Sequence, residues 1–433
     1  MIEADEGSRG IVHSAISLAR KKLVAHDNIF ASTHSGIAML AILDVLVTID
    51  FEPRLETAHK EQMEMVSSHM RTAFSIPDHR LSFRSGYPSE PFLAEAASRQ
   101  MYHYMRTGSR SMISILKENL DNGLIDPGQK GEVAMRVLLR SAYMDAIVAE
   151  QTNPSLQDPQ PNFSKGCGFL QFLKALFANI HHASILGAQP DNEVEQCTLE
   201  GAFKDAIVRF THFVKARDDS VVSTNAMAPG FLRGSAFICH NRQKDIDIII
   251  PILLDKCDTL AESSMSALLI QVKRQKKAGA FNPYIIDQKT LDFFPKVSSA
   301  GKSLRPYVTL LAELGVTSKS PTLQIGRTAP RSSPRSTSAN VKEKHPRYSL
   351  RAYGCTRTTW KAIDYYDTDD YEKVLGMDDF FKDHPRKDED SLRLVHQMLP
   401  CWYQDTAWFS DKRELTGAVA GGDGTGQPID VDD

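Results

Sequence analysis

The sequence predicts an α/β protein of the α+β class, in which a helical N-terminal region precedes a mixed β-sheet. Up to about residue 150, apolar residues recur at three- and four-residue spacing, most clearly over 91–105 and 131–150, as in helices packed on a core. From about residue 231 the pattern changes to short β-branched and aliphatic runs between polar links, which predict strands. Four such runs follow one another, at 234–240, 246–254, 266–273 and 305–315.

The composition is that of an ordinary globular protein. The chain has 433 residues, of which 42% are hydrophobic and 24% charged, enough for two or three domains. The formal net charge is -3. This balance excludes a wholly basic nucleic-acid-binding coat, so any affinity for nucleic acid must come from a local basic patch.

Nothing in the sequence predicts secretion or a membrane span. The most apolar early stretch, residues 36–49, is too short to cross a bilayer and contains Asp44, so we expect a buried helix or strand there. No basic segment followed by an apolar run opens the chain. The six cysteines are scattered without a CxxC pair. We therefore expect an intracellular protein of the nucleus or the cytoplasm, with reduced cysteines and no membrane partner.

Five segments are expected along the chain. The sheet-forming core should contain a helical insertion at about 151–230, with helices over 169–186 and 199–216. A later stretch rich in Ser, Pro, Thr and Arg predicts a flexible linker. The segments are a helical N-terminal region (1–115), the core (116–316), the basic linker (317–346), a C-terminal extension of the core (347–412) and a disordered tail (413–433).

Polar side chains interrupt the apolar pattern at one end of the second and third predicted strands. Read with a period of two, the third strand places Gln271 and Lys273 on one face. If the two strands form an antiparallel hairpin that turns near residue 260, positions that sum to about 520 lie opposite each other. This register sets Asp247 beside Lys273 and Ile249 beside Gln271, so three polar side chains gather at one edge of the sheet.

An acid, an amide oxygen and a lysine together suit metal-dependent hydrolysis of phosphodiesters. Carboxylate and carbonyl oxygens bind Mg²⁺ or Mn²⁺, and the ion neutralises the charge that grows on the scissile phosphate. The lysine orients or helps to deprotonate the attacking water, which requires a lowered pKa. The simpler interpretation is a cross-strand ion pair between Asp247 and Lys273, worth about 0.2 to 1 kcal/mol and without chemistry.

Asp247 followed by Gln271-Val272-Lys273 resembles the PD-(D/E)xK nuclease superfamily, whose core has an αβββαβ order and in which Gln replaces the usual acid in several branches. The resemblance implies a restriction-endonuclease-like core in which Asp247 and Gln271 bind the metal ion and Lys273 is catalytic. It also implies an acid on the preceding helix. Glu132, after a glycine-bounded turn that opens an amphipathic helix, is the first candidate, and Glu200 is the alternative.

Two flanking regions resemble fungal proteins related to the Crinkler class, in which nuclease-like domains often occur. They are residues 60–150, with SEPFLAEAA, and 345–400, with HPRYSLRAYGC and DFFKDHPR. The combined resemblance implies a metal-dependent nuclease. The alternative is a non-catalytic protein, such as an effector or a mobile-element remnant, that keeps the nuclease fold to bind nucleic acid or another protein.

A basic run directly after the third predicted strand is the candidate contact with nucleic acid. It is KRQKK at 273–277, so Arg274, Lys276 and Lys277 would lie beside the site, where a phosphate backbone must pass. A solvated charge run is the simpler explanation. DNA is the expected partner, and its binding should weaken steeply as the salt concentration rises.

Overall fold

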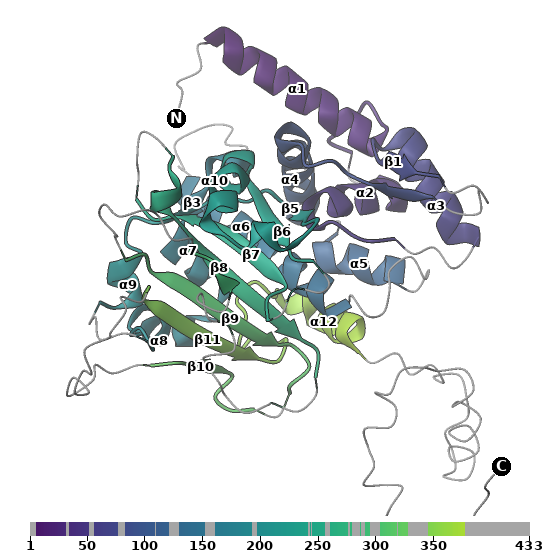
Figure 1. The fold of residues 1–433 in the computed structure, drawn as a ribbon. Helices are drawn as coiled ribbons and strands as arrows, with labels where there is room; N and C mark the ends of the chain where they lie inside the picture. The colour runs from purple at the N-terminus through teal and green to yellow at the C-terminus, as the bar shows by residue number, and fades with distance from the viewer. Residues whose placement is uncertain are drawn as a thin grey trace, which may run out of the picture. The chain divides into compact units, whose positions relative to one another are not determined.

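A mixed β-sheet lies at the centre of the computed structural model, with helices on both faces (Figure 1). Nine strands of the described residues join it, in the order β10-β11-β9-β8-β7-β4-β3, while β6 pairs with both β7 and β5. The α+β class predicted from the sequence is confirmed. The strands are β3 (Cys167–Gly168), β4 (Ile207–Val208), β5 (His212–Lys215), β6 (Ser235–Ile238), β7 (Ile248–Leu253), β8 (Met265–Lys273), β9 (Tyr307–Glu313), β10 (Leu323–Ile325) and β11 (Arg347–Tyr353).

The chain divides into two units, Met1–Gly376 and Met377–Asp433, and every described residue belongs to the first. The structure describes residues 6–376 except for 32–33, 52–55, 77–82, 109, 121–129, 152–160, 193–196, 241–242, 244, 256–259, 276–277, 279–285, 287–290, 295–303, 318 and 328–344. The predicted disordered tail and the later part of the predicted C-terminal extension lie outside these residues.

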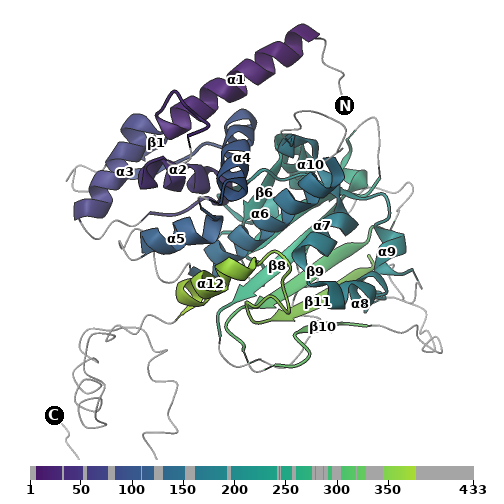
Figure 2. The ribbon, with the colours of Figure 1, turned by 180° about the vertical axis from the view of Figure 1, so that it is seen from behind.

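Helices form the N-terminal part of the first unit and cover the sheet. Seen from behind, α6, α7 and α8 lie over one face of the sheet (Figure 2). On the other face, Met227 and Phe231 of α10 pack against Ile249 and Leu269. The helices are α1 (Glu6–Val24), α2 (Gly36–Val47), α3 (Glu56–Ser68), α4 (Pro91–Arg106), α5 (Met112–Leu120), α6 (Lys130–Gln151), α7 (Phe169–Leu176), α8 (His182–Leu186), α9 (Leu199–Ala202), α10 (Thr224–Arg233) and α12 (Thr368–Leu375).

The four strands predicted between residues 234 and 315 are all present, as β6 to β9. β6, β7 and β8 pair in antiparallel fashion, and β9 lies parallel to β8. α6 precedes these strands in the chain, but β3, β4, β5 and the helices α7 to α10 lie between α6 and β6, so the αβββαβ order that the resemblance implies stays a prediction. Its second helix would fall in the connection between β8 and β9, most of which lies outside the described residues.

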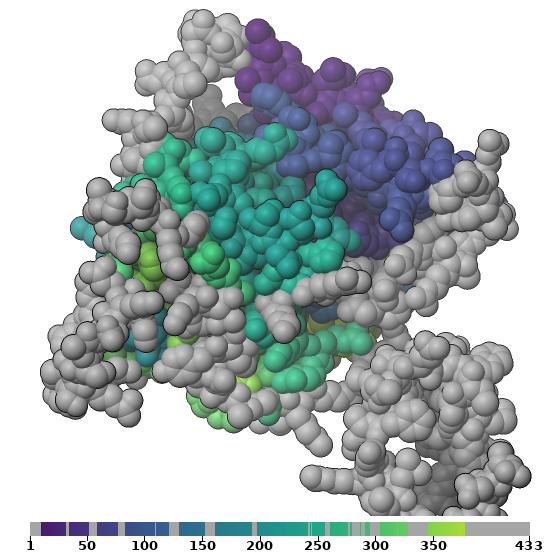
Figure 3. All heavy atoms as spheres, in the orientation of Figure 1, coloured from purple at the N-terminus to yellow at the C-terminus, as the bar shows by residue number. Residues whose placement is uncertain are grey.

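The N-terminal helices share one hydrophobic core with the sheet. α2 is buried from Ala38 to Val47, which explains its almost uniformly apolar sequence. Its acid, Asp44, forms an ion pair with Arg71 and accepts a bond of 2.6 Å from the Ile49 amide. In the space-filling view, blue atoms of this region adjoin the teal atoms of the middle of the chain (Figure 3). No helix long and apolar enough to cross a membrane occurs in the described part of the chain.

Three of the local predictions are wrong in part. Residues 199–216 are predicted to be helical, but only Leu199–Ala202 forms a helix, and β4 and β5 follow it. Their sequence, IVRFTHFV, is rich in β-branched and aromatic residues, and β7 and β6 offer them edges to pair with. Within the predicted linker 317–346, Leu323–Ile325 forms β10, which pairs antiparallel with β11. The hairpin of β1 (Thr72–Ser75) and β2 (Arg84–Gly86) also interrupts the helical N-terminal region.

Candidate functional site

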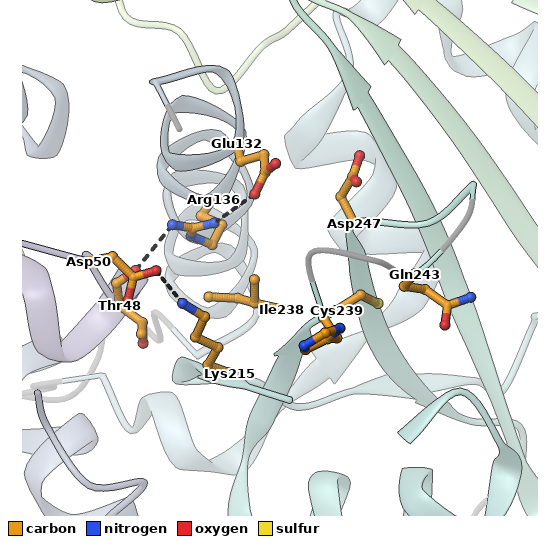
Figure 4. A pocket seen from close by; sticks show the side chains of 10 residues that line it. Thr48, Asp50, Glu132, Arg136, Lys215, Ile238, Cys239, Gln243 and Asp247 are labelled. Carbon is orange, nitrogen blue, oxygen red and sulfur yellow. Dashed lines mark hydrogen bonds and ion pairs between the residues drawn. The ribbon is translucent and has the colours of Figure 1, made fainter. Parts of the chain in front are cut away.

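A pocket opens where the ends of β5 and β6 meet the start of α6 and of β7 (Figure 4). It encloses about 140 Å³, the volume of roughly four or five water molecules. It therefore has room for an ion or a phosphate group. The side chains that line it are Thr48, Asp50, Glu132, Arg136, Lys215, Ile238, Cys239, His240, Gln243 and Asp247.

Helix α6 supplies Glu132 and Arg136, which lie one turn apart on the same side of the helix. The buried Arg136 donates from Nε to the Val47 carbonyl at 2.8 Å and from Nη2 to the Thr48 carbonyl at 3.1 Å. These carbonyls end α2, so the guanidinium satisfies acceptors that the helix leaves open. Nη1 lies 3.8 Å from Oε2 of Glu132, whose side chain is 41% exposed. Glu132 is thus held in place and still accessible to a ligand.

Asp247 precedes β7 at a point where the ladder with β8 is irregular. Its amide donates to the Ile270 carbonyl at 2.8 Å, although Ile270 is the register partner of Ile248. Two successive residues thus face one residue of β8, which is the arrangement of a β-bulge. The Val272 amide donates to Oδ2 of Asp247 at 2.6 Å. The bulge takes Asp247 out of the strand alternation, and its side chain lines the same pocket as Glu132.

The surroundings of Asp247 raise its pKa from the ordinary value to about 6. Burial is the largest cause, and the nearby Glu132 carboxylate adds to it. The bond from the Val272 amide and the positive charges of Lys273 and Arg136 act in the opposite direction. Two carboxyl groups held together in a small cavity favour the uptake of a proton or a cation.

A second charged pair lies in the pocket on the side of α2 and β5. Lys215, at the end of β5, forms an ion pair with Asp50, which follows α2 (Figure 4). The negative charge of Asp50 also raises the pKa of Arg136, although burial lowers it more, to about 10. The pocket therefore combines three carboxylates with two cations.

Gln271 and Lys273 lie elsewhere than predicted. The antiparallel pairing of the two strands is confirmed, but Ile249 lies opposite Leu269 and not opposite Gln271, a shift of two residues. Strand alternation places Gln271 and Lys273 on the face of Leu269, which packs towards α10. The three residues lie at the same end of β7 and β8, as predicted, but the bulge turns Asp247 to the α6 face, away from Gln271 and Lys273. Lys273 still lies near enough for its charge to lower the pKa of Asp247.

The other predicted residues divide between the site and the rest of the chain. Arg274 lies against the start of α6, since a Cβ placed on Gly131 would be 3.5 Å from the Cβ of Arg274. Glu200 is exposed in the first turn of α9 and does not line the pocket, so Glu132 is the acid that accompanies Asp247. Lys276 and Lys277 lie outside the described residues.

Glu132 and Asp247 are the residues of the pocket that could hold a divalent cation. Glu132 and Asp247 offer the carboxylates that Mg²⁺ and Mn²⁺ prefer. The buried Oε1 of Gln271 has no hydrogen-bond partner among the described residues, but alternation places it on the opposite face. No group of three or more His, Cys, Asp or Glu that could hold a metal ion occurs in the part of the chain that the structure describes. An ion held by the two carboxylates would complete its shell with water and substrate oxygens, as Mg²⁺ commonly does.

Several residues of the pocket were not anticipated from the sequence. Arg136 carries a local signal, because it follows Glu132 by four residues on an amphipathic helix. Asp50 and Lys215 carry none, since 165 residues separate them and only the tertiary fold brings them together.

The family described as Domain of unknown function (DUF8736) matches residues 28–290, more than half of the chain, and the chain belongs to that family. The matched segment includes every residue that lines the pocket and ends shortly after β8. No curated protein and no solved structure matches the chain.

Proposed function

We propose that this protein is a metal-dependent nuclease of the PD-(D/E)xK type that hydrolyses phosphodiester bonds of DNA, with Asp247 and Glu132 as its acids. The observation that supports this most is that the two carboxylates, predicted separately from the sequence, line one pocket, where burial and, less strongly, the charge of Glu132 raise the pKa of Asp247. The antiparallel β6, β7 and β8 and the parallel β9, which come after α6 in the chain, are compatible with the αβββαβ order, although β3 to β5 and α7 to α10 are inserted between α6 and β6.

In this proposal Asp247 and Glu132 would hold Mg²⁺ or Mn²⁺, and the ion would neutralise charge on the scissile phosphate. The Val272 amide orients the Asp247 carboxylate through a bond of 2.6 Å. Arg136 holds Glu132 from one turn along α6. Lys273 favours the ionised form of Asp247 through its positive charge. Arg274, beside the start of α6, would face the DNA backbone.

Calorimetric titration of the purified protein with Mg²⁺ and with Mn²⁺ tests the first part of the proposal. Asp247→Asn and Glu132→Gln should each weaken binding at least about tenfold, because each replaces a charged ligand with a neutral one. Gln271→Glu tests whether Gln271 is a metal ligand. The metal affinity should be unchanged if Gln271 faces α10, and should increase if Gln271 is a ligand.

Cleavage of plasmid DNA tests the second part. Activity should require the divalent ion and be lost in Asp247→Asn and Glu132→Gln, with circular dichroism confirming that both variants are folded. Lys273→Ala should reduce the rate, chiefly at low pH, where its charge helps to keep Asp247 ionised. If metal affinity and cleavage are the same in all variants and the wild type, the nuclease proposal is wrong.

A non-catalytic nucleic-acid- or protein-binding relative is the second candidate. It is favoured by the position of Gln271 and Lys273, which strand alternation places on the face opposite the two acids. For such a protein, DNA binding without cleavage would persist in Asp247→Asn and in the absence of divalent ions.

A further inference from the structure

Lys215 is the cation in the pocket that is best placed to change partners. Arg136 is fixed by its bonds to the two carbonyls at the end of α2. Lys215 and Asp50 keep 43% and 37% of their side chains exposed. An ion pair with this exposure contributes little to folding, and the lysine amine, on a flexible stem, carries three donors.

Of the two cations in the pocket, only Lys215 is exposed enough to meet an anion, since the Arg136 side chain is 3% exposed and that of Lys215 43%. Figure 4 shows Lys215 and Asp50 on one side of the pocket and Asp247 on the other, with Glu132 and Arg136 on α6. The cavity of about 140 Å³ has room for a phosphate group. A single phosphate that projects from a backbone would fit it.

We propose that Lys215 contacts a phosphate of the substrate and that Asp50 holds the lysine in place until the phosphate arrives. On binding, the Lys215 amine exchanges the Asp50 carboxylate for a phosphate oxygen. This deepens the proposed function and rests on it for the nature of the substrate. It also assigns to β5, far from the predicted motif in sequence, the lysine that meets the phosphate.

Two substitutions that break the same ion pair should have opposite effects on DNA binding. Lys215→Gln removes the contact and should weaken the binding of a fluorescein-labelled DNA duplex about tenfold. Asp50→Asn frees the lysine and removes a repelling charge, so it should tighten binding. The fluorescence anisotropy of the labelled duplex is measured in the presence of Ca²⁺ and again without divalent ions. Lys215→Arg should keep most of the DNA affinity that Lys215→Gln loses.

Lys21→Gln is the matched control. Lys21 is 44% exposed and pairs with Asp27 at 3.4 Å, but it lies on α1 and does not line the pocket. Measurements at about 0.5 M salt, where the Debye length is about 4 Å, separate a contact from a distant charge effect. At that salt the loss in Lys215→Gln should remain, while Lys21→Gln should bind like the wild type.

Two outcomes would overturn the inference. One is equal binding by Lys215→Gln and Lys21→Gln. The other is a change of the same sign in Lys215→Gln and Asp50→Asn, as expected of a merely structural ion pair. Failure of the nuclease proposal would give a different result. Substitution of Asp247 or Glu132 would then leave metal affinity and DNA cleavage unchanged, while Lys215→Gln could still weaken DNA binding.

Discussion

The two faces of the sheet at the β7–β8 end differ in how they treat polar groups. On the α6 face, Asp247, Glu132 and Arg136 meet in a pocket, and their charges act on one another. On the α10 face, Gln271 is half-buried, and its buried Oε1 has no hydrogen-bond partner among the described residues. One face therefore offers an accessible charged site, and the other carries a polar group at a cost in stability.

This difference shows how much one extra residue in a strand can change. Without the bulge, Asp247 would follow the alternation of Ile249 and share a face with Gln271 and Lys273. With the bulge, it joins the start of α6. Bulges are over-represented next to active sites for this reason, since they re-aim a side chain without disturbing the rest of the sheet.

The substitution with the largest expected effect removes the support of the α6 face. Arg136→Met leaves two carbonyls of α2 without their donor, so it should lower the free energy of unfolding by about 3 kcal/mol. Urea denaturation measures the change. Arg99→Met is the control, since Arg99 also pairs with a glutamate one turn away, at 2.7 Å, but is 14% exposed. The free energy of unfolding should fall less in Arg99→Met than in Arg136→Met. An equal decrease in both variants would mean that the bonds of Arg136 to α2 are unimportant.

Asp247→Asn should stabilise the protein at pH 7 while it abolishes the site. The pKa of Asp247 is raised from 3.8 to about 6, so protonation favours the folded state. The contribution of Asp247 is fully present below about pH 4 and is lost as the pH rises through about 6. Replacing the carboxyl group should therefore raise the stability at pH 7 by about 1 to 3 kcal/mol and flatten the profile between pH 4 and 6. Thermal unfolding at several pH values measures this, and an unchanged profile would contradict it.

Gln271→Met tests the α10 face. It should also stabilise the protein, and by the same amount at every pH. Removing a buried oxygen that lacks a partner should stabilise the fold by about 1 kcal/mol. Gln275→Met is the comparison, because the Gln275 amide donates to Glu313, and its loss should destabilise. A destabilised Gln271→Met would show that the Gln271 amide has a partner in the folded protein.

Gly131→Ala is expected to have the smallest effect. Alanine costs less conformational entropy than glycine in a helix, and a Cβ at this position would make ordinary contact with Arg274, at 3.5 Å. The midpoint of urea denaturation should rise by the equivalent of about 0.5 kcal/mol. A decrease would indicate that α6 and Arg274 lie closer together than the structure places them.

Much of the fold around the site could be predicted from the sequence, because the strands β6 to β9 and the helices α4 and α6 carry clear periodicity. The antiparallel pairing of β7 with β8 also followed from the pattern. The register did not, since it depended on where the connection near residue 260 turns. The bulge at Asp247 has no signature in composition or spacing. Asp50 and Lys215 were missed because nothing local connects them.

Arg136 has a consequence for the region that precedes the site. Its guanidinium lies between Glu132 and the carbonyl end of α2, so we expect occupancy of the pocket to stabilise the end of α2. A ligand that binds only the form in which this end is closed adds its binding free energy to the stability of that form. Amide hydrogens in the last turn of α2, which exchange through local opening, should then exchange more slowly when the pocket is filled. The N-terminal helices would thus report on the site without contributing to its chemistry.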